Sequence, residues 1–468
     1  MARSGYDAIS STGKRKAASP IIKSEDEYLL NRDRNAMIGS GQSLYRNFSM
    51  VAWAVRKHLD YNTHFGFQAR TEDEGFNEQL ETLMWEWERP ANCDSSGRMP
   101  FSSMLRLAEA RRVVDGDFFF MKRLDGTLSA VEADLIRDPD DLGNEGDRWF
   151  NGGKVNADGR VLAWGLHKRL RNGQYEFLRT VPSGNLVHLC NFDRFDQVRG
   201  ISPLASAFNS FRDVYEGVDY ALAKMKVEQL FAFVVKSANA SGTGEYVRNG
   251  DGTYDVDFGR GPVKLELDND DTAEFLKSDN PGSNTQDFIN LVLSMAIKAL
   301  DLPINFVDES RTNFFGSRAA WMLYDRSCVA KRAIILEALR KITVWKMAQW
   351  IQSGELVMPA GMLITDVDFE WVNLGMPWWD PAKEINGDLA AMQAGLDNPY
   401  RICKERGRGE FEENVLLLAK AKKFAEANGV SLSFLAAPPE AEPVQPAAPE
   451  EDAEEDDQEN PEEVSDES

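Results

Sequence analysis

One stretch decides how this chain folds and assembles: TQDFINLVLSMAIKALDL, residues Thr285–Leu302. Its polar residues recur at steps of three and four, which predicts a helix with a single narrow polar stripe. Apolar residues cover the rest of its surface, so we expect this helix to be packed on most sides and wet along one line. The stripe consists of Asp287, Asn290, Ser294, Lys298 and Asp301.

The composition around this helix is that of a folded protein with several domains. The chain has 468 residues, of which 43% are hydrophobic and 28% charged, and its length favours roughly two to four domains. The cysteines have no metal-ligand spacing, so we expect small buried side chains in a reducing compartment rather than ligands. No signal peptide or membrane-spanning segment is expected. The four cysteines are Cys93, Cys190, Cys328 and Cys403.

The formal charge of -23 is concentrated at the C-terminal end. From Pro438 onward the chain has 14 acidic residues and no Lys or Arg. Residues 430–468 are therefore predicted to be a disordered acidic tail, and the polar residues 1–24 a flexible arm. A chain this acidic does not wrap nucleic acid, because that requires clustered Lys and Arg. If DNA is a partner, it must pass by loosely.

The first 200 residues predict an α+β domain. Apolar steps of three and four indicate helices across Glu27–Trp87 and from Phe101 to Val114. A hairpin then runs from Phe118 to Val131, turning at Asp125-Gly126. Further strands are expected at Val161–Leu170, Gln174–Val181 and Leu186–Cys190.

The second half alternates long helices with short β segments. We expect a long helix over residues 203–236, a β-rich insertion at 237–284, a loop at 303–316 and a very long helix from Ser317 to about Gln352. A β segment ending at Trp371 follows. Three helices are expected between Pro381 and Asn428, since Pro favours first helical positions and Gly the residues after helix ends. Within the insertion, strands are predicted at Thr253–Phe258 and Val263–Leu267.

Catalytic motifs are missing from the sequence. It contains no Walker phosphate-binding loop, and its four histidines do not form a zinc motif. Acidic triplets such as Asp138, Asp140 and Asp141 suit a divalent cation in principle, but solvated turns are the simpler interpretation. The cluster of Trp371, Trp378 and Trp379 is typical of core or inter-domain packing. We therefore expect neither an enzyme nor a bound cofactor.

Several short motifs follow one another along nearly the whole chain. They are Ala91–Asp94 with Gly97-Arg98 and Phe101 after Trp85 and Trp87, Asp115–Asp117, Gln197–Pro203, Ala299–Pro303, Asn313-Phe314 with Ser317–Ala320, Pro377–Glu384 and Ala394–Leu396. Through the order and spacing of these motifs, rather than through any one of them, the chain resembles the lambda-like family of phage portal proteins.

This resemblance implies a portal fold with wing, stem, clip and crown parts, assembled as a dodecameric ring. Mapped onto this sequence, the wing is 25–202, the first stem helix 203–236 and the clip 237–284. The second stem helix is 285–302, followed by a tunnel loop at 303–316. The remaining parts are the wing's long helix and β segment at 317–380 and the crown at 381–429.

The resemblance also implies a function and partners. Double-stranded DNA passes through the ring during packaging and genome ejection, and the ring sits at the capsid's portal vertex after assembly in the host cytoplasm. Partners are the terminase large subunit, which supplies the ATPase, the major capsid protein and scaffold, and head-completion or tail proteins; no membrane is involved. Clip residues facing the terminase or adaptor would include Glu245, Arg248, Asp251 and Arg260.

A tunnel that conducts DNA must not bind it, because each paired phosphate adds friction through counterion release. An acidic lining with sparse cations keeps the duplex centred by repulsion. The polar stripe of 285–302 is therefore the candidate channel line, although it could instead face bulk water outside a ring. In the following loop, the candidate DNA-proximal residues are Asn305, Arg311, Asn313 and Phe314.

Two other classes of protein stay open at this point. A nuclease or packaging ATPase subunit predicts loss of activity when acidic clusters are mutated. A capsid or tail component without a DNA channel predicts that no closed ring with a central hole forms. A closed ring with a central hole would therefore favour a portal protein over a capsid or tail component without a channel.

Overall fold

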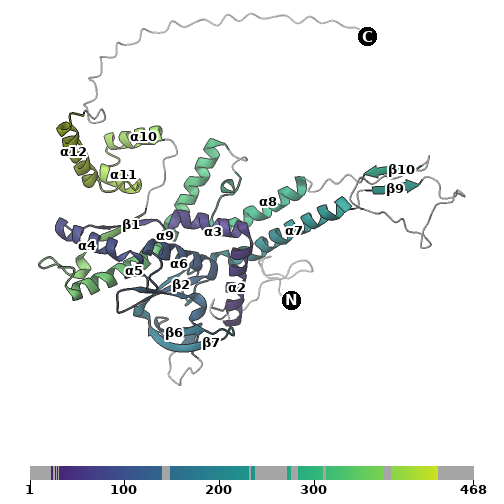
Figure 1. Cartoon of the computed structure of the whole chain (residues 1–468), viewed down its shortest axis with the longest axis horizontal. Helices are drawn as coiled ribbons and strands as arrows, with labels where there is room; N and C mark the ends of the chain where they lie inside the picture. The colour runs from purple at the N-terminus through teal and green to yellow at the C-terminus, as the bar shows by residue number, and fades with distance from the viewer. Residues whose placement is uncertain are drawn as a thin grey trace, which may run out of the picture. The chain divides into compact units, whose positions relative to one another are not determined.

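The computed structural model describes residues 23–24, 27, 29, 31–139, 148–230, 233–237, 271–275, 283–308, 313–373 and 381–430 (Figure 1). The chain divides into two compact units, residues 1–384 and 385–468. Most of the predicted N-terminal arm and clip, and the tail beyond residue 430, lie outside the described residues. The strands predicted at 253–258 and 263–267 lie outside them as well.

The N-terminal part of the first unit is helical, as predicted, with one strand among the helices. Asp73 caps α4 by accepting a hydrogen bond from the Phe76 amide at 2.9 Å, and Pro90 begins α5. The interpretation of Glu27–Trp87 as helices alone is wrong at β1, whose five residues are too few to show a clear alternation. The elements are α2 (Asn31–Asn47), α3 (Ser49–Asn62), β1 (Phe65–Ala69), α4 (Glu74–Trp87), α5 (Pro90–Cys93) and α6 (Phe101–Asp115).

Every strand pairing in the described part of the chain is antiparallel. The predicted hairpin is confirmed as β2 (Asp117–Lys122) and β3 (Leu128–Glu132), and β8 (Leu186–Cys190) pairs with the other edge of β2. A second sheet has the order β4-β5-β6-β7, of which only the last two strands were predicted. Its members are β4 (Arg148–Phe150), β5 (Gly153–Val155), β6 (Val161–Arg169) and β7 (Tyr175–Pro182).

The two helices that flank the predicted insertion at 237–284 pack against each other (Figure 1). The 203–236 helix is shorter than predicted: a 3₁₀ turn, η4 (Pro203–Ala207), precedes α7 (Phe208–Leu230), and β9 (Phe233–Ser237) pairs with β10 (Asp271–Phe275). Likewise, α8 (Ser283–Ile297) ends before the predicted boundary and continues as a 3₁₀ turn, η5 (Lys298–Leu300).

The long helix α9 (Phe314–Ser353) begins three residues before the predicted start at Ser317. Asn313 caps it by accepting a hydrogen bond from the Gly316 amide at 2.8 Å. After α9 ends at Ser353, a loop leads to the turn η8 (Ile364–Asp366) and to strand β11 (Phe369–Asn373), which pairs with β1. This pairing joins two segments about 300 residues apart in the chain.

Three apolar clusters form the interior of the first unit. One packs α4, α6 and β2 against the second half of α9 and Trp371. Another packs α2, α3 and α6 against α7, α8 and the first half of α9. The third lies between β2 and the β6–β7 sheet. Cys93, Cys190 and Cys328 are buried and Cys403 is half-buried, which confirms the structural interpretation of the first three.

The second unit contains the predicted set of helices. They are α10 (Pro381–Gln393), which starts just before the unit, α11 (Pro399–Glu405) and α12 (Phe411–Ala427). Gly407 and Gly429 have φ values of 60° and 67°, as expected of glycines that end helices. Among the described residues from 385 to 430, only Ala425 is buried.

Candidate functional surface

The polar stripe predicted on residues 285–302 lies on one side of α8. Asp287 and Lys298 are exposed, whereas Asn290 and Ser294 are half-buried. The Ser294 hydroxyl donates to the Leu291 carbonyl at 2.7 Å, so it is satisfied within the helix. The opposite side of the helix, including Ala296 and Ile297, is buried in the apolar cluster that contains α7.

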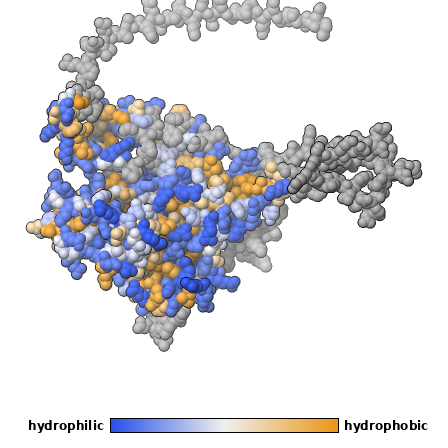
Figure 2. All heavy atoms as spheres, in the orientation of Figure 1, coloured by the Kyte–Doolittle hydropathy of each residue, from blue (hydrophilic) through white to orange (hydrophobic). Residues whose placement is uncertain are grey.

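A third side of α8 is apolar and exposed within the single chain. Phe288, Leu291 and Met295 are 65%, 57% and 62% exposed. Their spacing of three and four residues places them in one strip, directly beside the polar stripe. Figure 2 shows hydrophobic residues on the molecular surface along the α7–α8 pair. The expectation that α8 is packed on most sides therefore holds for only part of its apolar surface.

Asp301 does not continue the stripe as a helical residue. It follows η5 in the left-handed conformation, with φ of 60°. Its carboxylate pairs with Lys331 of α9 at 2.8 Å, and the same ammonium donates to the Leu300 carbonyl at 2.7 Å. The helix ends earlier than predicted because its last apolar residues turn into the interior, where Leu300 and Leu302 are buried.

The candidate DNA-proximal residues of the 303–316 loop lie in different environments. Asn305 is half-buried in the 3₁₀ turn η6 (Ile304–Phe306), which is anchored because Phe306 stacks on Tyr61 with 5.8 Å between ring centroids. Asn313 is an exposed helix cap, and Phe314 is the first residue of α9. Arg311 and the clip candidates Glu245, Arg248, Asp251 and Arg260 lie outside the described residues.

A buried ion network, not predicted from the sequence, centres on Asp117. Its carboxylate, which is 0% exposed, accepts hydrogen bonds from Arg34 at 2.8 Å and from Arg199 at 2.6 and 3.0 Å. His188 Nε2 lies 3.2 Å from the same carboxylate. Burial alone raises the pKa of Asp117, but Arg199 and Arg34 outweigh it and hold that pKa well below its ordinary value.

The same network connects several elements through Arg199. Its remaining donors reach the carbonyls of Ala133, Ile136 and Asn151 at 2.8, 2.9 and 2.5 Å. Beside it, Gly116 has φ of 101°, and a Cβ there would lie 2.6 Å from the Gly200 carbonyl oxygen. Two of the resemblance motifs, Asp115–Asp117 and Gln197–Pro203, thus meet in space and fix the entry into α7.

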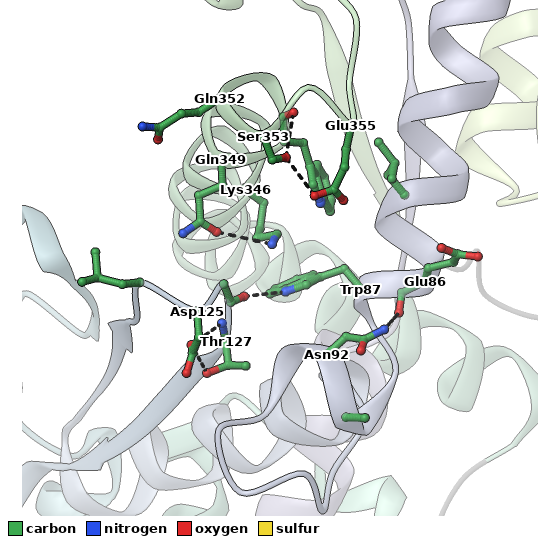
Figure 3. A pocket seen from close by; sticks show the side chains of 15 residues that line it. Glu86, Trp87, Asn92, Asp125, Thr127, Lys346, Gln349, Gln352, Ser353 and Glu355 are labelled. Atoms are coloured by element: carbon green, nitrogen blue, oxygen red, sulfur yellow. Dashed lines mark hydrogen bonds between the residues drawn. The ribbon is translucent and has the colours of Figure 1, made fainter.

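A hollow beside the Ala91–Asp94 motif lies between α4–α5, the β2–β3 turn and the end of α9 (Figure 3). Its volume is about 590 Å³. The Trp87 indole donates to the Gly126 carbonyl at 2.9 Å, and the Lys346 ammonium lies 4.8 Å from the Trp350 ring centroid. Burial lowers the pKa of Lys346. The Ser353 hydroxyl donates to the Glu355 carboxylate at 2.8 Å in this hollow, and no His or Cys lines it.

The described residues contain no group of three or more His, Cys, Asp or Glu side chains placed to hold a metal ion. None of the helices in the described part is long and apolar enough to cross a membrane. His58, within 2.7 Å of a Glu109 carboxylate oxygen, is buried in a structural contact.

The comparison with protein families identifies the class. The model described as "Phage portal protein, lambda family" matches residues 13–332. The chain therefore belongs to the lambda family of phage portal proteins. Members of this family are structural, non-enzymatic components, which confirms the expectation that the chain is not an enzyme.

Several solved structures are similar at low sequence identity. A chain from the virion of a native gene transfer agent particle is 12% identical, with a TM-score of 0.46, covering 80% of this chain and 92% of that one. A chain from the neck of an empty particle of the same kind is 12% identical, with a TM-score of 0.49, covering 78% and 92%. An HK97-family phage portal protein from Corynebacterium diphtheriae is 12% identical, with a TM-score of 0.27, covering 56% and 77%. No curated protein matches the chain.

Proposed function

We propose that this portal protein assembles as a closed ring whose central channel conducts DNA, and that the polar stripe of α8 lines the channel. The proposal rests mainly on one observation: a polar stripe, exposed at Asp287 and half-buried at Asn290 and Ser294, runs beside an exposed apolar strip on the same helix. A neighbouring copy covers the apolar strip, while the polar stripe stays in contact with water. The proposed channel line consists of Asp287, Asn290, Ser294 and Lys298, since Asp301 is bound by Lys331 outside the helix.

Burial of the apolar strip supplies a driving force for assembly. Fully burying a Phe, Leu or Met side chain contributes about 1.5–3 kcal/mol. In the proposed ring, each copy covers this strip with a different surface from the one that it offers in return. Such head-to-tail contacts generate a ring when the rotation closes. Twelve copies are the number that the family resemblance implies.

The charges of the proposed channel line suit a channel through which DNA slides. Asp287 repels phosphates, Asn290 and Ser294 are neutral, and Lys298 is the one cation in the line. A lining with so few positive groups offers the duplex no continuous set of phosphate contacts, so DNA can slide. Asp301 lies near the end of the line outside the helix, and its charge is compensated by Lys331.

The remaining parts of the proposal concern assembly in the virion. The ring occupies the portal vertex, after assembly with capsid and scaffold proteins in the host cytoplasm. The clip, with Glu245, Arg248, Asp251 and Arg260, docks first the terminase and then the head-completion proteins. Residues 25–202 and 317–380 form the wing, which the β1–β11 pairing supports by joining the two segments. Residues 381–429 form the crown.

A packaging assay tests the channel line. In Asp287→Lys, every copy adds a cation where DNA passes, so packaging should slow several-fold while ring assembly, followed by sedimentation, is retained. Glu78→Lys makes the same change of charge at an exposed position on α4 and should package normally. Normal packaging by Asp287→Lys in intact rings would show that the stripe does not line the channel.

Replacing Asp301 is a poorer test, although the sequence alone suggests it. A lysine at that position would face Lys331 and break the ion pair that holds the turn after α8. A packaging defect in Asp301→Lys could then arise from local misfolding instead of friction. If the chain is instead a virion component without a channel, Asp287→Lys and Glu78→Lys should have the same effect in the packaging assay.

A further inference from the structure

A groove on the first unit runs between α2 and the turn that joins β6 to β7. Its volume is about 710 Å³, and four of its lining residues are arginines. We call it the arginine groove. It is lined by Asn35, Ile38, Gly39, Gln42, Arg46, Arg111, Glu132, Asp134, Arg137, Arg169, Gly173 and Tyr175.

At one end of the arginine groove the positive charges are compensated. Arg169 binds the Asp134 carboxylate at 2.5 Å and that of Glu132 at 3.2 Å. Arg137 stacks on the Tyr175 ring, 3.5 Å from its centroid, and the Tyr175 hydroxyl donates to Asp134 at 2.6 Å. This end is a closed network that needs no further anion.

At the other end the charges are poorly compensated. Arg46 is exposed on α2, and Arg111 lies over the Tyr45 ring at 5.5 Å. The carboxylate nearest to Arg111 is that of Asp115 at 3.7 Å, which is too long for a hydrogen bond. The Arg111 Nε is buried with no acceptor among the described residues.

Asp115 is also a weak counter-charge. Burial raises its pKa to about 6, with a smaller opposing effect from Arg111. Asp115 therefore loses its negative charge progressively as the pH falls through about 6, which leaves more excess positive charge on Arg111 below that pH. Guanidinium groups with unfilled donors bind carboxylates in charge-assisted, often bidentate hydrogen bonds.

We propose that the arginine groove binds the acidic tail of this chain, residues 438–468. The tail supplies 14 carboxylates and no cation, and eight of them fall within residues 450–459. A fully extended chain spans at most roughly 3.3–3.6 Å per residue, so 38 residues have a maximum reach of about 130 Å. The charges of tail and groove are complementary, and the proposal does not depend on the ring or its channel.

Site-specific photo-crosslinking in the full-length chain tests this pairing. Gly39 lies on the groove wall, and a Cβ added there meets nothing within 4 Å, so Gly39→p-benzoylphenylalanine places the probe in open groove space. The same probe at Val357, an exposed residue outside the groove, is the control. Mass spectrometry identifies the cross-linked peptides.

Cross-links from position 39 to residues 438–468 are expected, with few or none from position 357. Adding Arg46→Glu and Arg111→Glu should reduce them roughly tenfold, because two favourable charges become repulsive. Adding Arg160→Glu and Arg340→Glu, two exposed arginines outside the groove, changes the net charge equally and should leave the yield unchanged. Tail cross-links that are absent, or that survive the groove reversal, would overturn the proposal, as would cross-links to DNA in their place.

Discussion

The interior of the first unit and the surface of α8 use similar apolar residues in opposite ways. Around α9, side chains such as Leu339 and Ile342 are fully buried by their own chain. On α8, Phe288, Leu291 and Met295 remain more than half exposed. The difference teaches that a single chain completes the core around α9 by itself, whereas its fold leaves the apolar strip of α8 exposed.

The helices of the second unit resemble α8 in this respect. On α12, the four consecutive residues Val415, Leu416, Leu417 and Leu418 are all exposed, so apolar side chains face every side of the helix. A helix that is apolar all round is normally buried. Residues 385–430 are thus another region whose apolar surface exceeds what its own fold covers.

Disrupting the buried ion network around Asp117 should cause the largest loss of stability in the first unit. Asp117→Asn leaves Arg34 and Arg199 buried without their counter-charge, so we expect a loss of about 3–5 kcal/mol in the free energy of unfolding. Urea unfolding of the full chain measures it. Glu176→Gln, an exposed carboxylate on β7, should change stability by less than about 0.5 kcal/mol. Equal stability of the two variants would refute the structural role of the network.

A pair of leucine truncations compares the two regions directly. Leu339→Ala removes a side chain that is 0% exposed and should cost about 2–5 kcal/mol of unfolding free energy. Leu417→Ala removes one that is half exposed, and should cost less than about 0.5 kcal/mol in the unassembled chain. The comparison fails if thermal unfolding shows the two losses to be alike.

A charge placed in the apolar strip of α8 should affect assembly and leave folding intact. Leu291→Glu should weaken association between copies by roughly tenfold or more, because a carboxylate replaces about 1.5–3 kcal/mol of apolar burial. Circular dichroism should show an unchanged chain. Sedimentation velocity measures association, and unaltered assembly of this variant would mean that the strip is not an interface.

The smallest predicted effect concerns pH and Glu88. Burial raises the pKa of Glu88 from 4.5 to about 7. The folded chain therefore binds this proton more tightly than the unfolded chain, and wild-type stability decreases as the pH rises between these two values. Glu88→Gln removes that decrease, so its stability relative to wild type should rise by on the order of 1 kcal/mol from about pH 5.5 to 7.5. A difference that does not vary with pH would contradict the shift.

Much of the fold could be predicted because periodicity is local. The β2–β3 hairpin, strands β6 to β8 and the three C-terminal helices follow from alternation, turn residues and the Pro and Gly positions. The ends of α7 and α8 could not be predicted, because the β9–β10 pairing and the burial of Leu300 are tertiary effects. Strand β1 was missed because its partner is about 300 residues away.

The site was predicted less completely than the fold. The stripe from Asp287 to Lys298 could be predicted from residue spacing alone. Asp301 does not belong to it, because it follows the turn η5 in a left-handed conformation. Asp117 and Arg199 each stood in a motif used for the resemblance. Nothing in one sequence says that a carboxylate and a guanidinium 82 positions apart become partners. A contact between residues so far apart in the sequence becomes visible only in the three-dimensional structure.

The most direct test of the central claim is electron microscopy of the purified protein at side-chain resolution. The account predicts a closed ring with a central hole, in which Asp287 and Lys298 face the hole and Leu291 is covered by the adjacent copy. Single chains, open tubes, or a ring whose Asp287 side chains point outward would contradict it.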